Sequence, residues 1–550
     1  MTAEKNTPGN IVLDNSPFTL LRNGWIVDGT GARRFKGDLL IKDDKIEQVS
    51  EAAIEKDCEA IDCSGKIISP GFIDMHSHMD WILPMPGRAD LKAPFISQGC
   101  TSFVAGNCGY SPAGFKKNSQ YQDLISLGGD VAFDITWDTM DGYFDHIAHT
   151  GMSHNLVNFV GHGMARASMR GFDPSALNPD EMRELLFLLE EALDQGACGV
   201  SFGLGYEPGI FATDDEIRQI AALVAKKDKI MSVHGRAYSL LSMAYEIVPD
   251  GEPHNVISLK EMIEVARDTG VRMQYSHLMF AGSNSHPTYT QCLDIIDGAR
   301  RDGIDIMTDT YPYHCGNSII NVILPAWFLA NIPANYHNSE ALQKAEEEML
   351  FISELLGFGF DDIQISHASH PELDRYNGMF LSEIAEQTGK RPFEVVMEFS
   401  EKTGGRAKVL NHNYSTMEII DALIQYPACL FMTDTVVNSA GGVHNPATYG
   451  TFPLLLQYAR DRKLVSCEEA VYKMTGASAE RYNIKDRGML KPGLAADVTV
   501  FDWETVQDNN TLSETNKAPT GIDMVFINGA LVKRGDHLDQ DLEHGRVVRI

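Results

Sequence analysis

The pattern of hydrophobic and polar positions divides this chain into three parts. The first part and the C-terminal tail both alternate short strand-like apolar runs with turns, for example 24–27 near the start and 524–529 near the end. Such alternation is typical of short strands with one buried face. Because the two ends are alike in kind, we expect residues 1–66 and 486–550 to form one small β-sandwich domain.

The middle part, residues 67–485, has the alternating strand and helix pattern of an α/β protein. It contains eight apolar segments that end in polar or small residues, with helical patterns between most of them. One helix is expected to open at Asn178-Pro179, where an N-cap residue precedes a first-turn proline. Eight alternations predict a (β/α)8 TIM barrel, and a doubly wound open sheet is the alternative. The predicted strands span 67–78, 101–109, 155–162, 198–206, 229–236, 272–277, 304–313 and 428–434.

The connection between the last two predicted strands is far longer than an ordinary crossover. It runs from about 314 to 427 and contains a helical stretch, 339–355, and another strand-like stretch, 363–367. We expect this insertion to lie over the catalytic face of the barrel, as a lid or a substrate-binding subdomain.

Side chains that bind metals follow the predicted strands. His76 and His78 end the first one and, on an extended strand, would point to the same face. One such pair is weak evidence by itself. However, catalytic residues of a TIM barrel lie at the C-terminal ends of its strands, and imidazole and thiolate are preferred zinc ligands. The other strand ends add Cys108, His234, His277 and Asp434.

These residue types suit the hydrolysis of a carbonyl compound. A bound zinc ion lowers the pKa of its water to about 7 and polarises the carbonyl group. A neighbouring carboxylate can take a proton from the water and deliver it to the leaving nitrogen. We assign this catalytic role to Asp434.

Several motifs together resemble one known family. PGFIDMHSHMD, VAGNCG, VHGR, SHL and TD, followed by NPATYGTF and DRGMLKPGLAADVTVFD, resemble the D-aminoacylase (N-acyl-D-amino-acid deacylase) branch of the amidohydrolase superfamily. The resemblance covers roughly residues 26–535. It implies a metal-dependent barrel that cleaves the amide bond of an N-acyl compound.

The resemblance also implies a division of the metal ligands. Many amidohydrolases bridge two metals with a lysine at the end of strand four, but the segment 200–206 has none. The D-aminoacylase branch uses a cysteine after strand two instead, which matches Cys108. By this resemblance, Cys108, His234 and His277 hold one tightly bound zinc. His76 and His78 form a second site, weaker or vacant.

Two positions depart from the family pattern. The family has a lysine two residues after the strand-six histidine, which helps to hold the substrate carboxylate, and an arginine just before the GTF segment. This chain has Met279 and Ala447 there. A carboxylate buried without a partner costs several kcal/mol. Either another cation, such as Arg236 or His444, takes over, or the substrate has no free carboxylate, and we favour the second interpretation.

Tyrosines complete the predicted substrate site. Tyr311 and Tyr313 follow the seventh strand, where a hydroxyl could donate to the substrate carbonyl or to an oxyanion, and a packed aromatic pair is the alternative. The full predicted substrate-binding set is Tyr206, Arg236, Met279, Tyr311, Tyr313 and Ala447.

Composition and charge limit the classes of partner that this protein is expected to bind. The net charge of −30, from 46 basic and 76 acidic residues, argues against nucleic acid or an anionic membrane as a partner. The nine cysteines are scattered without a CxxC pair, which is typical of a reducing compartment. The first ten residues have no hydrophobic signal core, so we expect a cytoplasmic protein that takes a small-molecule amide or acyl substrate. Assembly into a homo-oligomer stays open.

Two other functions compete with amide hydrolysis of an N-acyl compound. The first is hydrolysis of a cyclic amide, imide, lactone or ester, because the same activated water attacks any of these carbonyl groups. The second is a non-catalytic barrel that keeps a metal site. Loss of Asp434 or of several ligands would favour the second, and the sequence retains them all.

Overall fold

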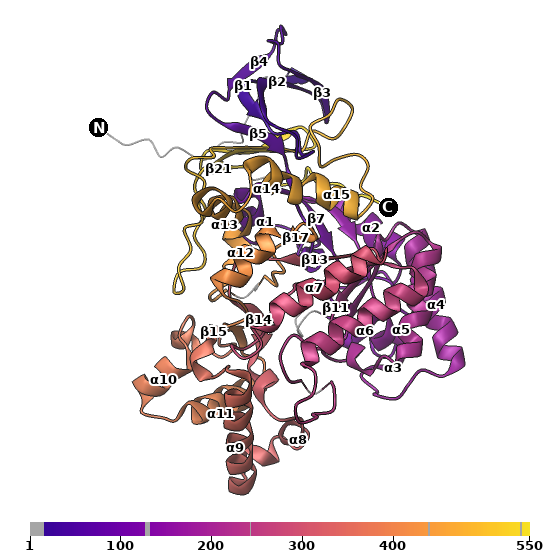
Figure 1. The fold of residues 1–550 in the computed structure, drawn as a ribbon, viewed down its shortest axis with the longest axis vertical. Helices are drawn as coiled ribbons and strands as arrows, with labels where there is room; N and C mark the ends of the chain where they lie inside the picture. Colours follow the sequence, from indigo (N-terminus) through magenta and orange to yellow (C-terminus); the bar gives the residue numbers. More distant parts are fainter. Residues whose placement is uncertain (1–15, 127–132, 243, 438–440, 540–541) are drawn as a thin grey trace.

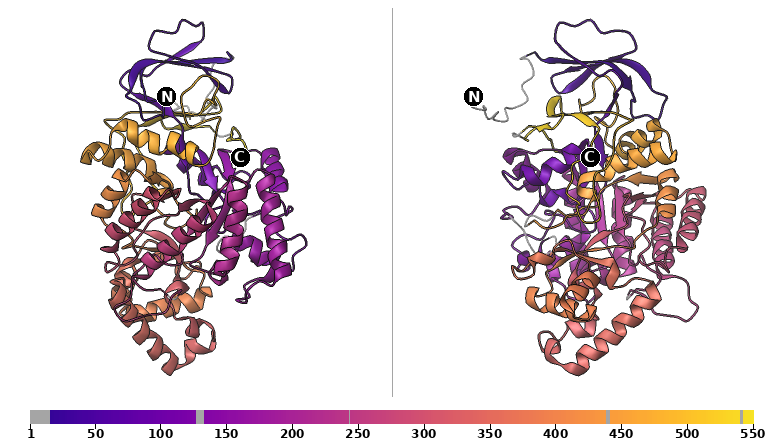
Figure 2. Two further views of the ribbon diagram at one scale, coloured as in Figure 1. Left: turned by 45° about the vertical axis from the view of Figure 1, so that its right-hand side comes forward. Right: turned by 90° about the vertical axis from the view of Figure 1, so that its left-hand side faces the viewer.

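The computed structural model describes residues 16–126, 133–242, 244–437, 441–539 and 542–550. The first ten residues, on which the prediction about a signal core rests, lie outside these ranges. Figures 1 and 2 show a central barrel with a β-sheet layer at one end and a helical lobe at the other. Within the described ranges, no helix is both long enough and apolar enough to cross a membrane.

Strands from both ends of the chain form one nine-stranded sheet in the order β21-β20-β19-β18-β5-β1-β2-β3, with β4 beside β1. The junction is the antiparallel pairing of β5 with β18, in which Ile68 lies opposite Val500. Because β5 belongs here, the predicted boundary at residue 66 falls inside this sheet. The strands are β1 (Phe18–Ile26), β2 (Phe35–Lys42), β3 (Lys45–Ser50), β4 (Glu59–Asp62), β5 (Ile67–Pro70), β18 (Val498–Phe501), β19 (Ile522–Ile527), β20 (Ala530–Arg534) and β21 (His537–Leu538).

The barrel strands follow one another in chain order, as β6-β7-β8 and β17-β13-β12-β11-β10-β9. Their neighbours pair in parallel, and only Phe159 separates β8 from β9. This order lacks the reversal of a doubly wound sheet, so the fold is the predicted TIM-barrel type. The strands are β6 (Phe72–Asp74), β7 (Cys100–Ala105), β8 (Asn155–Asn158), β9 (Val160–Gly161), β10 (Gly199–Gly203), β11 (Ile230–His234), β12 (Arg272–Tyr275), β13 (Ile306–Thr310) and β17 (Cys429–Phe431).

The prediction of one continuous strand over 67–78 is wrong. The segment divides at Gly71, where a Cβ atom would collide with the side chain of Thr101. Residues before it join the terminal sheet and residues after it join the barrel as β6. His76 and His78 lie beyond β6 in irregular backbone, so the alternation of a strand does not explain their common direction.

Helices cover the outside of the barrel (Figure 1). The expected start at Asn178 is confirmed, because its side chain accepts hydrogen bonds from the amides of Asp180 and Glu181. These helices are α1 (Ala89–Ser97), α2 (Met140–Thr150), α3 (His162–Arg170), α4 (Pro179–Asp194), α5 (Asp214–Lys226), α6 (His254–Thr269), α7 (Thr288–Arg301), α12 (Met417–Gln425), α13 (Ala447–Arg462), α14 (Cys467–Lys473) and α15 (Gly476–Arg481).

The insertion forms a lobe with its own apolar core, which includes Phe328, Ile365 and Phe399. Its sheet has the antiparallel order β14-β16-β15. The helix predicted at 339–355 and the strand predicted at 363–367 are both present, as α9 and β15. The elements are β14 (Gly316–Ile319), α8 (Ala326–Leu329), α9 (Ser339–Leu356), β15 (Ile363–His367), α10 (Leu381–Thr388), α11 (Pro392–Thr403) and β16 (Lys408–Asn411).

The loop after β16 ties this lobe to the C-terminal ends of two barrel strands. The amide of Phe280, after β12, donates to the carbonyl of Tyr414 at 2.9 Å. The amide of Tyr414 donates to the carbonyl of His314, after β13, at 2.9 Å. The loop therefore lies at the end of the barrel where metal-ligand candidates were predicted.

Candidate metal centre

Four side chains from four barrel strand ends form one compact group. The candidate ligand atoms of His76, Cys108, His277 and Asp434 all lie within 4.8 Å of one another. The Sγ atom of Cys108 lies 3.3 Å from Nε2 of His76 and 3.5 Å from Nε2 of His277. Asp434 Oδ1 lies 3.2 Å from His76 Nε2. The first three residues are buried, and the Asp434 side chain is 18% exposed.

The two remaining predicted ligands border this group. His78 Nε2 lies 3.5 Å from Asp434 Oδ1, and His234 Nδ1 lies 2.9 Å from His277 Nε2. The five predicted metal ligands and the predicted catalytic residue Asp434 therefore meet at one end of the barrel. Their division into a tight and a weak site is not determined by these distances, since His76 and His277 both contact the cysteine sulfur.

Three members of the group have left-handed backbone. The φ angles are 57° at Cys108, 33° at His277 and 49° at Asp434. Such angles cost on the order of 1–3 kcal/mol for most non-glycine residues, less for aspartate, and persist where surrounding contacts fix them. At His277 one such contact is its amide, which donates to Asp309 Oδ1 at 2.6 Å. The strained positions coincide with the candidate ligands, which supports a functional role for all three.

The charges in this group suit a divalent cation. Burial opposes ionisation of Cys108, but the imidazoles of His76, His234 and His277 hold the pKa of the thiol well below its ordinary value. Burial likewise opposes ionisation of Asp434, and His277 and His76 hold the pKa of that carboxyl well below its usual range. The pair offers two anionic donors among imidazoles.

The donor atoms in this group are of the types that bind metal ions. Thiolate, imidazole and carboxylate are all ligands of zinc-type metals. The candidate donor atoms of His76, Cys108, His277 and Asp434 also lie within 4.8 Å of one another. The residues present therefore fit a bound metal ion.

Sequence reasoning missed the buried aspartates behind the group. Asp309 on β13 lies 3.6 Å from His76 Nδ1, and its other oxygen accepts from Gln274 Nε2 at 2.8 Å. Asp74 on β6 accepts from the amide and hydroxyl of Thr433 at 2.9 and 2.6 Å. A carboxylate placed like that of Asp309 can orient a metal-binding histidine, whereas Asp74 holds Thr433, next to Asp434. The available signal in the sequence was a charged residue within a predicted strand: Asp74 follows the apolar pair Phe72 and Ile73, and Asp309 lies between two threonines.

Two predicted tyrosines lie near the candidate ligands and one is directed elsewhere. Tyr206 donates to the carbonyl of Cys108 at 2.8 Å, and its ring lies 4.8 Å from that of His234. Tyr311 is buried, and its hydroxyl has no partner among the described residues. Tyr313 donates to Asp508 Oδ2 at 2.8 Å, so its hydroxyl is engaged with the C-terminal part of the chain.

The remaining substrate candidates carry no available positive charge. Arg236 donates to Glu261 at 3.0 Å and to the carbonyls of Ile210 and Ala212 at 3.1 and 2.8 Å. Met279 is half-buried and packs against the barrel core. Ala447 is fully buried at the start of α13.

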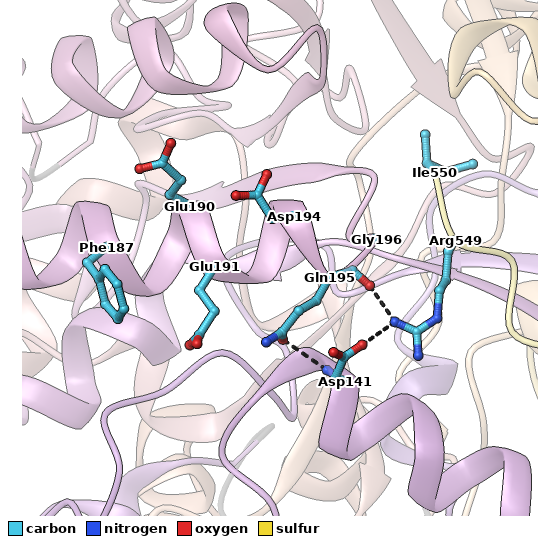
Figure 3. Close-up of a pocket in the computed structure, with 9 residues that line it drawn as sticks. All are labelled: Asp141, Phe187, Glu190, Glu191, Asp194, Gln195, Gly196, Arg549 and Ile550. Atoms are coloured by element: carbon cyan, nitrogen blue, oxygen red, sulfur yellow. Dashed lines mark hydrogen bonds and ion pairs between the residues drawn. The ribbon is translucent and has the colours of Figure 1, made fainter.

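A pocket on the outer surface is separate from these residues. Figure 3 shows it between α2, α4 and the C-terminal residues, with Arg549 bonded to Asp141 and to the carbonyl of Gln195. No predicted site residue is among those that line it. Its acidic side chains lie on helices outside the barrel, so the candidate chemistry is not located there.

Two known proteins are similar to this chain over nearly its whole length. It is 30% identical to the D-aminoacylase of Alcaligenes xylosoxydans xylosoxydans over 94% of this chain and 95% of that protein. It is 29% identical to the N-acyl-D-glutamate deacylase of the same organism, over 93% of each. The model of the amidohydrolase family matches residues 359–533.

Solved structures agree with the sequence comparison. The N-acyl-D-glutamate deacylase from Bordetella bronchiseptica, complexed with zinc and a phosphonate inhibitor, is 27% identical with a TM-score of 0.77, over 98% of this chain and all of that one. A D-aminoacylase structure is 26% identical, also with a TM-score of 0.77, over 97% of this chain and 99% of that one.

The chain belongs to the D-aminoacylase family of the amidohydrolases. It is a metal-dependent amidohydrolase that acts on carbon–nitrogen bonds other than peptide bonds. The predicted family and class of enzyme are thereby confirmed, and the hypothesis of a non-catalytic barrel is set aside.

Proposed function

We propose that this enzyme is a zinc hydrolase of N-acyl compounds whose acylated portion has no free carboxylate. The observation that carries this proposal is the loss of both cationic positions of the family, now Met279 and Ala447. Ala447 is buried, and Arg236 already donates to Glu261 and to two carbonyl groups. A substrate carboxylate would therefore lack a cation at these three positions, which favours a neutral substrate.

Zinc is the proposed metal because of the donor set. Cys108, His234 and His277 would hold the tight ion, and His76 and His78 would provide the second position. One thiolate with two imidazoles is a common zinc set that leaves a fourth position for water or substrate. The relative from Bordetella bronchiseptica, which is 27% identical, was solved with zinc.

Bound zinc would supply a water of lowered pKa and a polarised substrate carbonyl. Asp434 would take the proton of the attacking water and deliver it to the leaving nitrogen. Its position supports this role, because Oδ1 lies within 3.5 Å of both His76 and His78. Its partial exposure also leaves the carboxylate accessible to a substrate.

A hydrolysis screen tests the proposal. N-acetyl amino acids of both hands would be compared with their amides and with neutral aryl amides, using the zinc-loaded enzyme and release of acetate as the readout. We expect the neutral compounds to react faster than the acids. Efficient turnover of N-acetyl-D-methionine or N-acetyl-D-glutamate would contradict the proposal. Cyclic amides, imides, lactones and esters belong in the same screen, since the metal centre alone does not distinguish them.

A further inference from the structure

A group of uncharged polar side chains lies where the insertion meets the barrel. Tyr311 follows β13, Asn411 ends β16, and Tyr414 lies in the loop that hydrogen-bonds to the segments after β12 and β13. None of these positions is charged, unlike the lysine and arginine that the family would use.

The register of the small sheet sets the distances within this group. Gly316 on β14 lies directly opposite Asn411 on β16. A Cβ atom at position 316 would lie 3.3 Å from the Tyr311 hydroxyl and 2.7 Å from the Tyr414 ring. Opposed Cβ positions in an antiparallel pair are about 4.5–5.5 Å apart. The Tyr311 hydroxyl and Asn411 therefore both neighbour Gly316, and Asn411 Nδ2 donates to Tyr414 Oη at 3.2 Å.

Two buried atoms in this group lack partners. Tyr311 Oη and Asn411 Oδ1 have no hydrogen-bond partner among the described residues. Buried polar atoms are rarely left unsatisfied, and leaving one costs about 1–3 kcal/mol. A hydroxyl can donate whereas an amide oxygen only accepts, so one occupant that both accepts and donates would satisfy both atoms.

The group also lies close to the catalytic aspartate. The amide of Met432, two residues before Asp434, donates to the carbonyl of Thr310 at 3.2 Å, and Tyr311 and Met432 belong to one apolar cluster. Besides burial, the charge of Asp434 is also one cause that raises the pKa of Tyr311 and of Tyr414. None of the three side chains is a cation, so a carboxylate placed among them would lack a charged partner there, whereas a neutral amide needs only hydrogen bonds.

We propose that Tyr311, Asn411 and Tyr414 bind a second amide group of the substrate, next to the acyl amide that is cleaved. The amide oxygen accepts from Tyr311, and the amide N–H donates to Asn411 Oδ1. The substrate class is then N-acyl amino acid amides and short N-acyl peptides. This inference rests on the proposed function, because it specifies what occupies the space of the family's carboxylate.

Three compounds of similar size separate the contributions of hydrogen-bond donation, hydrogen-bond acceptance and charge to recognition of the substrate. N-acetyl-leucinamide donates and accepts, N-acetyl-leucine methyl ester accepts only, and N-acetyl-leucine carries the charge; each would be tested in both hands with acetate release as the readout. For the wild type we expect the amide to exceed the ester and the acid in kcat/KM. Loss of one hydrogen bond in Asn411→Leu should lower the amide value about tenfold or more and leave the ester nearly unchanged.

Two further variants serve as comparisons. Tyr311→Phe should lower the values for amide and ester alike, because both present an acceptor. Asn317→Leu changes the neighbouring position on β14, which pairs with Leu410 and points to the opposite face of the sheet. It should leave the ratio of amide to ester unchanged, and thermal unfolding of each variant checks that the fold is retained.

Calorimetric binding to the zinc-loaded enzyme distinguishes failure of this inference from failure of the proposed function. Preferential binding of the amide that disappears in Asn411→Leu supports the inference, even if no acetate is released and the proposed function fails. Equal affinity for amide and ester in the wild type, or no binding of either, overturns it. An unchanged preference in Asn411→Leu also overturns it.

Discussion

The Sγ atom of Cys108 lies 3.3 Å from Nε2 of His76. The sulfur predicted for the tight metal site therefore contacts an imidazole predicted for the second site. Since His277 Nε2 is almost as close to the sulfur, at 3.5 Å, the two predicted sites form one continuous group of donors. Changes at either site are expected to affect the other.

Cys108 is the first residue to test. Replacing its thiolate in Cys108→Ala removes a ligand and the anionic charge among three imidazoles, so we expect loss of the tightly bound zinc. Metal analysis of the purified variant gives the result directly. A full zinc content in this variant would show that the cysteine is not a ligand, and the free buried Cys292 offers a matched Cys292→Ala control.

A substitution of Asp434 tests proton transfer separately from metal binding. In Asp434→Asn we expect the metal to remain and turnover to fall by about 10²–10⁴-fold, because positioned acid–base groups contribute that much. Metal content and kcat would be measured on the same preparation. Near-normal turnover would remove Asp434 from the mechanism.

Asp309 is expected to act through His76 and His277. Asp309→Asn keeps the size of the side chain but removes the charge 3.6 Å from His76 Nδ1. Loss of such a positioning carboxylate typically weakens metal binding about 10–100-fold. Competition with a chelator measures that affinity, and Asp302→Asn on the exposed surface is the control. Unchanged metal affinity in Asp309→Asn would limit Asp309 to a structural role.

Restoring the family's cationic residue should have different effects at Met279 and at Ala447. Met279 is half-buried, so a lysine there can extend its ammonium group towards water, and Met279→Lys should raise activity on N-acetyl amino acids relative to their amides. Ala447 is fully buried, so Ala447→Arg should overpack the start of α13 and destabilise the fold by about 1–3 kcal/mol or more. Thermal unfolding and the ratio of acid to amide turnover test both statements.

The sequence was sufficient to predict the barrel and the six residues that meet at its end. Strand ends in a barrel converge on one rim, so chain order alone brings Cys108 and Asp434 together. It was not sufficient for the backbone around His76, because the division at Gly71 depends on the contact with Thr101 in a neighbouring strand.

The group formed by Tyr311, Asn411 and Tyr414 could not be predicted from the sequence, for a similar reason. Asn411 lies in a connection of more than a hundred residues, and its proximity to Tyr311 follows from the pairing of β16 with β14 across nearly that whole distance. No local pattern marks such a pairing. The roles of Arg236 and Tyr313 were equally hidden, because their partners, Glu261 and Asp508, are set by tertiary contacts.

The most direct test of the account is acetate release from N-acetyl-leucinamide and N-acetyl-leucine by the same enzyme preparation, before and after removal of zinc and after its return. We predict hydrolysis of the amide that is lost with the metal and restored by zinc, with the acid turned over at least tenfold more slowly. Hydrolysis that persists without metal, or a preference for the acid, would contradict the central claim that this enzyme uses zinc to cleave neutral N-acyl compounds.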